Sequence, residues 1–162
     1  MYFSKLKTNN KKMWLDLKNL TSNNVNFVLA ELNRLVEQYS VDKSRLIVES
    51  KDYISLGLLK ENGYYVSYYV PYDKPGRLDD NEYKAAILEL QKVVDSGKVS
   101  AISFPGWWYE SIKSDLNRNI DLLTWEHRKI RAELFFYPYC RDMLKDKRVK
   151  VILIKDKGKY HK

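Results

Sequence analysis

Short apolar runs alternate with segments of helical periodicity along almost all of this 162-residue chain, and this alternation limits the possible folds more than any other feature. Six runs are short, apolar and rich in β-branched or aromatic residues, which is typical of strands. The segments between them repeat apolar residues at steps of three and four, which predicts helices. We expect strands separated by helices to run parallel. The expected strands are residues 13–17, 45–49, 64–70, 99–104, 120–125 and 149–154.

Capping and breaking residues agree with this alternation. Asp52 is typical of a helix N-cap, because its carboxylate can accept from the first free backbone N–H groups. Gly63 and Gly97 are expected to end helices, since glycine readily adopts the left-handed conformation found there. Segment 126–147 is predicted to be mostly helical, with Pro138 dividing it into two pieces.

The pattern therefore predicts an α/β fold built from a parallel (β/α) repeat with about six strands. Two architectures accommodate it: an open doubly wound sheet, or part of a (β/α)8 barrel of the TIM type. The length favours a single domain over residues 1–162, ending in a charged tail at 155–162.

Composition narrows the classes of function. The chain has 29 Lys and Arg against 21 Asp and Glu, a net charge of +8, which suits an anionic partner such as a phosphate-bearing small molecule or polymer. A lone cysteine, Cys140, argues against a disulfide scaffold or a cysteine zinc site. No glycine-rich phosphate loop is present, so no nucleotide cofactor is expected. No run is long and apolar enough for a transmembrane segment, and residues 1–12 lack a signal sequence, so a complete chain is expected in the cytoplasm.

Polar and aromatic residues collect at the ends of the expected strands, where parallel α/β folds place their chemistry. Asp16 and Lys18 share one face of the first strand, and Glu49 ends the second. Charges in buried strands are costly unless they are paired or bind a ligand. Further candidates at or just after strand ends are Tyr68, Trp107, Trp125 and His127.

Each candidate also has a purely structural interpretation. Asp16 and Lys18 would form an ion pair, and Glu49 would cap the next helix. His127 would be an exposed loop histidine, and Trp107 would belong to the core. Because Trp107 and its neighbour Trp108 follow a Pro-Gly pair, they would equally form a platform for a sugar, which leaves a sugar-acting transferase open.

Two short motifs resemble the glycerophosphodiester phosphodiesterases. Trp14-Leu15-Asp16-Leu17-Lys18-Asn19 resembles the strand of that family in which an acidic residue is followed, one position on, by lysine. Leu123-Thr124-Trp125 resembles its penultimate strand. The family is grouped with phosphatidylinositol-specific phospholipase C in a TIM-barrel superfamily. The resemblance implies that the chain corresponds to barrel strands three to eight.

The resemblance also implies roles. Asp16 would be an acidic metal ligand, Lys18 would face the substrate phosphate, and Trp125 would wall the pocket. The family uses a divalent cation, usually Ca or Mg, with a histidine, but its His-Arg and Glu-x-Asp pairs are absent from this sequence. We therefore expect a phosphodiesterase that is weak or inactive alone and binds Mg or Ca weakly. The full expected site is Lys18, Glu49 and His127 for catalysis, Tyr68, Trp107 and Trp125 for substrate, and Asp16 and Glu49 for the metal.

A non-catalytic module that binds a phosphate-bearing polymer is the alternative from another class. An enzyme would gather its polar residues at one end of the sheet, whereas a polymer binder would carry a continuous Lys/Arg stripe with exposed aromatic residues. Six of eight barrel strands would leave open edges near Leu15 and Leu153, which predicts self-association.

Overall fold

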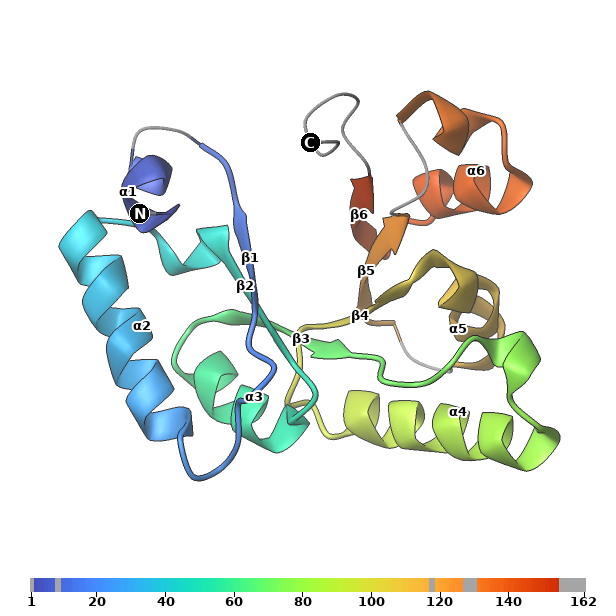
Figure 1. Ribbon diagram of the computed structural model, residues 1–162, viewed down its shortest axis with the longest axis horizontal. Helices are drawn as coiled ribbons and strands as arrows, with labels where there is room; N and C mark the ends of the chain where they lie inside the picture. Colours follow the sequence, from blue (N-terminus) through green and yellow to red (C-terminus); the bar gives the residue numbers. More distant parts are fainter. Residues whose placement is uncertain (1, 8–9, 117–118, 127–130, 155–162) are drawn as a thin grey trace, which may run out of the picture. The chain divides into compact units, whose positions relative to one another are not determined.

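The structure, a computed structural model, describes residues 2–7, 10–116, 119–126 and 131–154 (Figure 1). Its six strands form a sheet in the sequential order β1-β2-β3-β4-β5-β6. β1 pairs in parallel with β2, β2 with β3, and β5 with β6. The predicted α/β class, with helices between parallel strands as in part of a TIM barrel, is confirmed. The strands are β1 (Met13–Asp16), β2 (Leu46–Ser50), β3 (Tyr65–Tyr69), β4 (Ala101–Pro105), β5 (Asp121–Glu126) and β6 (Val149–Ile154).

The helices occupy the predicted connections, and the chain divides into two compact units. The α-helices are α1 (Tyr2–Lys7), α2 (Val25–Tyr39), α3 (Tyr53–Glu61), α4 (Asp80–Asp95), α5 (Tyr109–Asp115) and α6 (Pro138–Lys145). Short 3-10 helices are η1 (Lys43–Arg45), η2 (Pro75–Arg77), η3 (Gly106–Trp108) and η4 (Arg131–Phe135). Among the described residues, no helix has the length and apolar character needed to cross a bilayer.

The first unit comprises Met1–Tyr69 and Val93–Ala101. In it α3 packs against β2 and β3, and α2 contacts both α1 and α3 (Figure 1). All five residues of β2 are buried, as expected for a strand covered on both faces. The helix signals act as predicted: the Asp52 carboxylate accepts from the N–H groups of Ile54 and Ser55, both at 3.1 Å, and Gly63 follows α3 with φ +86°.

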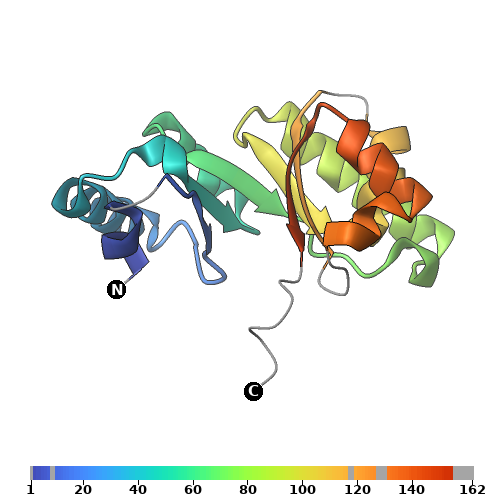
Figure 2. The ribbon, with the colours of Figure 1, turned by 90° about the horizontal axis from the view of Figure 1, so that it is seen from above.

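The second unit comprises Val70–Lys92 and Ile102–Lys162. Strands β5 and β6 lie side by side, and α6 contacts α5 (Figures 1 and 2). The largest fully buried side chains of this unit form its core; they are Leu90, Ile102, Phe104, Trp108, Tyr109, Ile112, Leu122, Leu123 and Met143.

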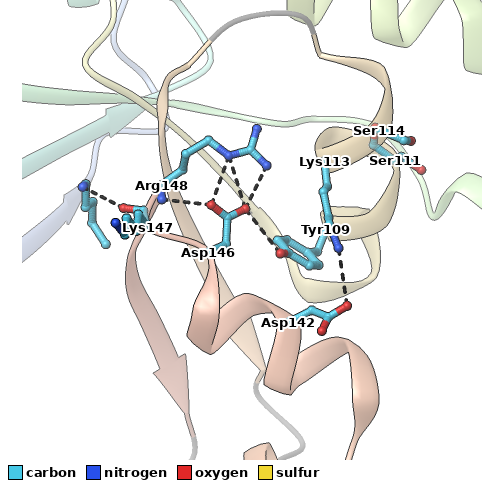
Figure 3. A network of polar contacts seen from close by, with 9 residues as sticks. Tyr109, Ser111, Lys113, Ser114, Asp142, Asp146, Lys147 and Arg148 are labelled. Atoms are coloured by element: carbon cyan, nitrogen blue, oxygen red, sulfur yellow. Dashed lines mark hydrogen bonds and ion pairs between the residues drawn. The ribbon is translucent and has the colours of Figure 1, made fainter.

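A polar network joins α5 to the turn between α6 and β6 (Figure 3). The Arg148 guanidinium donates to both carboxylate oxygens of Asp146, the shortest contact being 2.8 Å, and the Tyr109 hydroxyl donates to the same carboxylate at 3.3 Å. These bonds from Arg148 lower the pKa of Asp146, while burial raises the pKa of Tyr109. The network therefore holds the start of β6 against α5.

One part of the chain differs from the expectation outright, and a second differs from it at its first residue. Helix α1 precedes β1, whereas no helix was predicted for that segment from the sequence. The segment predicted to be mostly helical from 126 to 147 begins with Glu126 still in β5, and its described residues form two helical pieces, η4 and α6, as predicted. The division falls at Pro138, which begins α6, because the N–H that proline lacks has no hydrogen-bond partner within the helix at that position.

Candidate functional site

A row of polar side chains crosses the first unit near the C-terminal ends of its strands. The parallel ladders place Asp16 opposite Glu49, and Glu49 opposite Ser67. Residues in register share a face of the sheet, so these three side chains point to the same side. Asp16 is exposed, whereas Glu49 is 5% exposed and Ser67 is fully buried. The strand ends thus form a polar site whose side chains are exposed at β1 and increasingly buried towards β3.

The Ser67 hydroxyl is the innermost group of this row. It has no hydrogen-bond partner within the described part of the chain. Buried hydroxyl groups are rarely left unsatisfied, because the lost hydrogen bond costs about 1–3 kcal/mol. A polar ligand atom beside the row would supply that partner.

Next to the row lies a cavity of about 240 Å³, lined by Asp16, Lys18, Ser50, Lys51 and Tyr69. The Lys18 ammonium is 3.7 Å from the Asp16 carboxylate, and the Lys51 ammonium lies 5.3 Å from the centre of the Tyr69 ring. The lining carries two cations and one carboxylate. Its local charge is therefore positive, which favours an anion.

The ion pair between Asp16 and Lys18 leaves the lysine available. Their side chains are 48% and 81% exposed, and a pair as exposed as this contributes at most about 1 kcal/mol. Lys18 can therefore turn to an anionic ligand at little cost.

Tyr69, rather than Tyr68, is the tyrosine that lines the cavity. Alternation along β3 puts Tyr69 on the face of Ser67 and Tyr68 on the other face. Tyr68 is 5% exposed and meets the ring of Tyr53 edge to face, with ring centres 6.4 Å apart. The structure therefore places Tyr69 in the lining of this cavity, and the substrate-binding role expected for Tyr68 stays a prediction.

Lys51 and Tyr69 are cavity residues that the sequence analysis did not select. The sequence did contain a signal for both: Lys51 lies two positions after Glu49, and Tyr69 lies two positions after Ser67. Strand periodicity carries such residues onto the same face when the strand conformation continues.

The remaining candidates belong to the second unit or lie outside the described residues. Trp107, in η3 after β4, is 55% exposed, and Trp125 is half-buried near the end of β5. Trp108, the next residue, is fully buried, and its ring stacks on the ring of Tyr83, with ring centres 6.2 Å apart. His127 lies outside the described residues.

The Leu123-Thr124-Trp125 motif lies on β5, whose last residue, Glu126, closely approaches η3. The Thr124 hydroxyl donates to the Phe104 carbonyl at 2.9 Å, which ties β5 to β4. A Cβ atom at Gly106 would overlap the Glu126 carboxylate. Any larger residue at 106 would therefore require the Glu126 carboxylate at the end of β5 to move.

The described residues do not form a complete site for a divalent cation. Asp16 and Glu49 are adjacent in register, but no group of three or more potential His, Cys, Asp or Glu ligands occurs in the described part of the chain. Mg and Ca require about six or more oxygen ligands, so water would have to supply most of the shell. No catalytic step is therefore assigned to a metal.

Structure comparison finds a similar fold in a crystal structure from Galdieria sulphuraria, assigned as a glycerophosphodiester phosphodiesterase. The TM-score is 0.58 at 16% sequence identity, and the match covers 94% of this chain. The chain spans 57% of that protein, and at this identity the likeness concerns the fold alone. No protein-family model matches the sequence. Comparison with curated proteins also gave no match.

Proposed function

We propose that this chain binds a phosphate-bearing small molecule, and that any phosphodiesterase activity of the chain alone is weak. The supporting observation is the cavity that sets Lys18 and Lys51 beside the polar row of Asp16, Glu49 and Ser67. The fold similarity to a protein assigned as a glycerophosphodiester phosphodiesterase supports the same class of ligand.

The residues of the cavity suit a phosphate group. Ammonium groups bind phosphate oxygens through charge-assisted hydrogen bonds, which are about twice as strong as neutral ones. A volume of about 240 Å³ fits a small phosphate ester rather than a large ligand. Ser50 adds a buried hydroxyl to the lining, and Ser67 carries a second one in the adjoining row.

In a phosphodiesterase built on this site, Glu49 would accept the proton of the attacking water and Lys18 would stabilise charge on the phosphoryl oxygens. His127, Trp107 and Trp125 remain proposed catalytic and substrate-binding residues by resemblance. Because only two carboxylates are available for a cation, we expect turnover far below that of a complete metal-dependent phosphodiesterase.

Binding of glycerol 3-phosphate to the 162-residue protein tests the ligand class. We expect the double variant Lys18→Ala/Lys51→Ala to weaken binding about tenfold or more, since two charge-assisted hydrogen bonds are lost. The double variant Lys84→Ala/Lys92→Ala is the matched control, because both are exposed lysines on α4 and their loss lowers the net charge by the same two units. Titration calorimetry measures all three proteins.

The same samples separate the alternatives. If a short oligonucleotide binds better than glycerol 3-phosphate, and Lys84→Ala/Lys92→Ala weakens oligonucleotide binding as much as Lys18→Ala/Lys51→Ala does, the polymer-binding alternative is correct. If a neutral oligosaccharide binds while the phosphate ester does not, the sugar-acting alternative gains support. Equal affinity of the double variant and wild type for glycerol 3-phosphate would contradict the proposed site.

A further inference from the structure

Exposed apolar side chains are concentrated in one part of the second unit. The described residues include nine large apolar side chains that are exposed, and five of them fall between positions 135 and 153. These five are Phe135, Phe136, Tyr137, Leu144 and Leu153. Single exposed apolar residues are common, so whether this region is an interaction surface depends on what the neighbouring strand and groove offer.

An apolar groove of about 310 Å³ lies in the same region. One part of its lining comes from η4 and α6, through Leu134, Met143 and Leu144, and the rest is strand β6. The β6 residues are Val149, Lys150, Val151, Ile152 and Ile154. Strand β6 therefore presents both its side chains and its outer edge to whatever fills the groove.

The two end strands of the sheet are protected to different degrees. β1 has four residues and ends at the exposed Asp16, and the Arg45 guanidinium donates to the Lys11 carbonyl just before it, at 2.7 Å. β6 has six residues and one charge, Lys150, which bonds to the Lys147 carbonyl at 2.9 Å and lies 3.5 Å from the Asp121 carboxylate. Short or charged edges resist pairing, whereas long apolar edges favour it.

The hydrogen-bonding pattern identifies the outward-facing backbone groups of β6. The Leu122 N–H donates to the Arg148 carbonyl at 2.7 Å. The ladder shifts register between Leu122 and Leu123, where Lys150 is an extra residue of β6, so the alternation along β5 is unbroken and Thr124 also faces β6. Thr124 is in register with Ile152. In a parallel ladder the bonds from Thr124 go to the neighbours of Ile152, which leaves the N–H and C=O groups of Ile152 and Ile154 at the outer edge.

We infer that β6 pairs antiparallel with β6 of a second copy of this chain, about a twofold axis at Ile152. This register sets Ile152 opposite its own counterpart, Val151 opposite Leu153, and Lys150 opposite Ile154. Each pair of opposing residues then contains at most one charged side chain, and the two Lys150 ammonium groups do not face each other. An interface of this kind is self-complementary, as twofold symmetry requires.

A second strand fits this edge better than a lipid surface does. The outer N–H and C=O groups need hydrogen-bond partners, and hydrocarbon supplies none. A strand supplies them along its whole length, while the groove receives alternate side chains, as in other cases of strand addition. The β6 sequence, Val-Lys-Val-Ile-Leu-Ile, has high strand propensity and is identical in both copies.

Cysteine cross-linking tests both the interface and its register. In the full chain, Ile152→Cys places two thiols across the proposed axis, where opposing Cα atoms would be about 5.5 Å apart, within the range of a disulfide. Mild oxidation should give a covalent dimer. Phe27→Cys is the control, because Phe27 is 74% exposed on α2, in the other unit. The native Cys140 is fully buried.

Sedimentation at tens of micromolar supplies the second measurement. We expect wild type and Phe27→Ala to be dimers, and Leu153→Lys to be a monomer, because it places a charge opposite Val151 at a site that is exposed in the isolated chain. A wild-type monomer, or equal cross-linking of the 27 and 152 cysteine variants, would overturn the inference. A monomer that floats with anionic vesicles would show that lipid covers this surface instead.

Discussion

Asp16 is the exposed carboxylate of the strand-end site, and the Lys18 ammonium lies 3.7 Å from it. A bound divalent cation would have to compete with that lysine, and Asp16 belongs to no group of three or more acidic, His or Cys ligands in the described part of the chain. At the scale of single residues, the lysine therefore opposes the metal that the carboxylates attract.

This competition predicts weak metal binding. Calorimetric titration with Ca and with Mg should give dissociation constants on the order of millimolar, as for low-affinity sites with few charged ligands. Asp16→Ala should abolish the heat of binding, while Lys18→Ala should strengthen binding by removing a repulsive charge. Tight binding that survives Asp16→Ala would place the metal elsewhere and remove support for the phosphodiesterase proposal.

The cavity residues show how far single residues could be predicted. Asp16, Lys18 and Glu49 were selected because charges in buried strands are costly, and they lie in or beside the site. Lys51 and Tyr69 were missed because each sits at a strand end, where the sequence does not say how far strand geometry continues. A one-residue difference there moves a side chain to the other face.

At the scale of elements, the turn between α6 and β6 depends on one carboxylate. Asp146 is 13% exposed and accepts hydrogen bonds from the Arg148 guanidinium and the Tyr109 hydroxyl (Figure 3). Its neighbour Asp142 is 51% exposed, and its carboxylate lies 3.4 Å from the Lys113 ammonium. The two residues therefore make a matched pair, one enclosed and one open to solvent.

We expect Asp146→Asn to lower the free energy of unfolding by about 2 kcal/mol at neutral pH, because a charged hydrogen-bond network is broken. Asp142→Asn should cost less than about 1 kcal/mol, as for exposed ion pairs. Since the pKa of Asp146 is lowered in the folded state, its contribution is complete above the ordinary aspartate pKa and is lost as the pH falls below it. Urea unfolding at neutral and acidic pH measures the difference, which should shrink in acid; equal losses for the two variants would contradict this account.

Elements were predicted better than their ends because periodicity is a property of many residues at once. All six strands fall within two residues of their expected limits, and Gly63 and Gly97 both adopt positive φ after helices. Pro138 was harder to interpret. Proline stops a helix that reaches it and starts one that follows it, and the sequence around 126–147 did not distinguish these cases.

At the scale of the whole molecule, the net charge of +8 acts in opposite directions on the two proposed interactions. Two copies of the chain repel each other, so added salt should strengthen the pairing of β6 by screening that repulsion. Binding of a phosphate ester should weaken over the same range, because salt screens its attraction to Lys18 and Lys51.

Sedimentation and glycerol 3-phosphate titration at low and at high NaCl measure the two effects on one preparation. We expect the dimer fraction to rise and the phosphate affinity to fall. If salt dissolves the dimer instead, ion pairs rather than apolar strands hold the copies together, and the register centred on Ile152 is wrong.

The first unit is not a continuous stretch of chain, since it includes Val93–Ala101 as well as Met1–Tyr69. The Lys60 ammonium on α3 donates to the carbonyls of Gly97 and Val99, at 2.8 and 2.9 Å, and Gly57 of the same helix packs against Lys98. On the ribosome, α3 emerges about 39 residues before the second of these carbonyls. The unit that carries the candidate site therefore cannot be completed until α4 and the segment after it have been translated. A nascent chain released before residue 101 lacks a part of this unit.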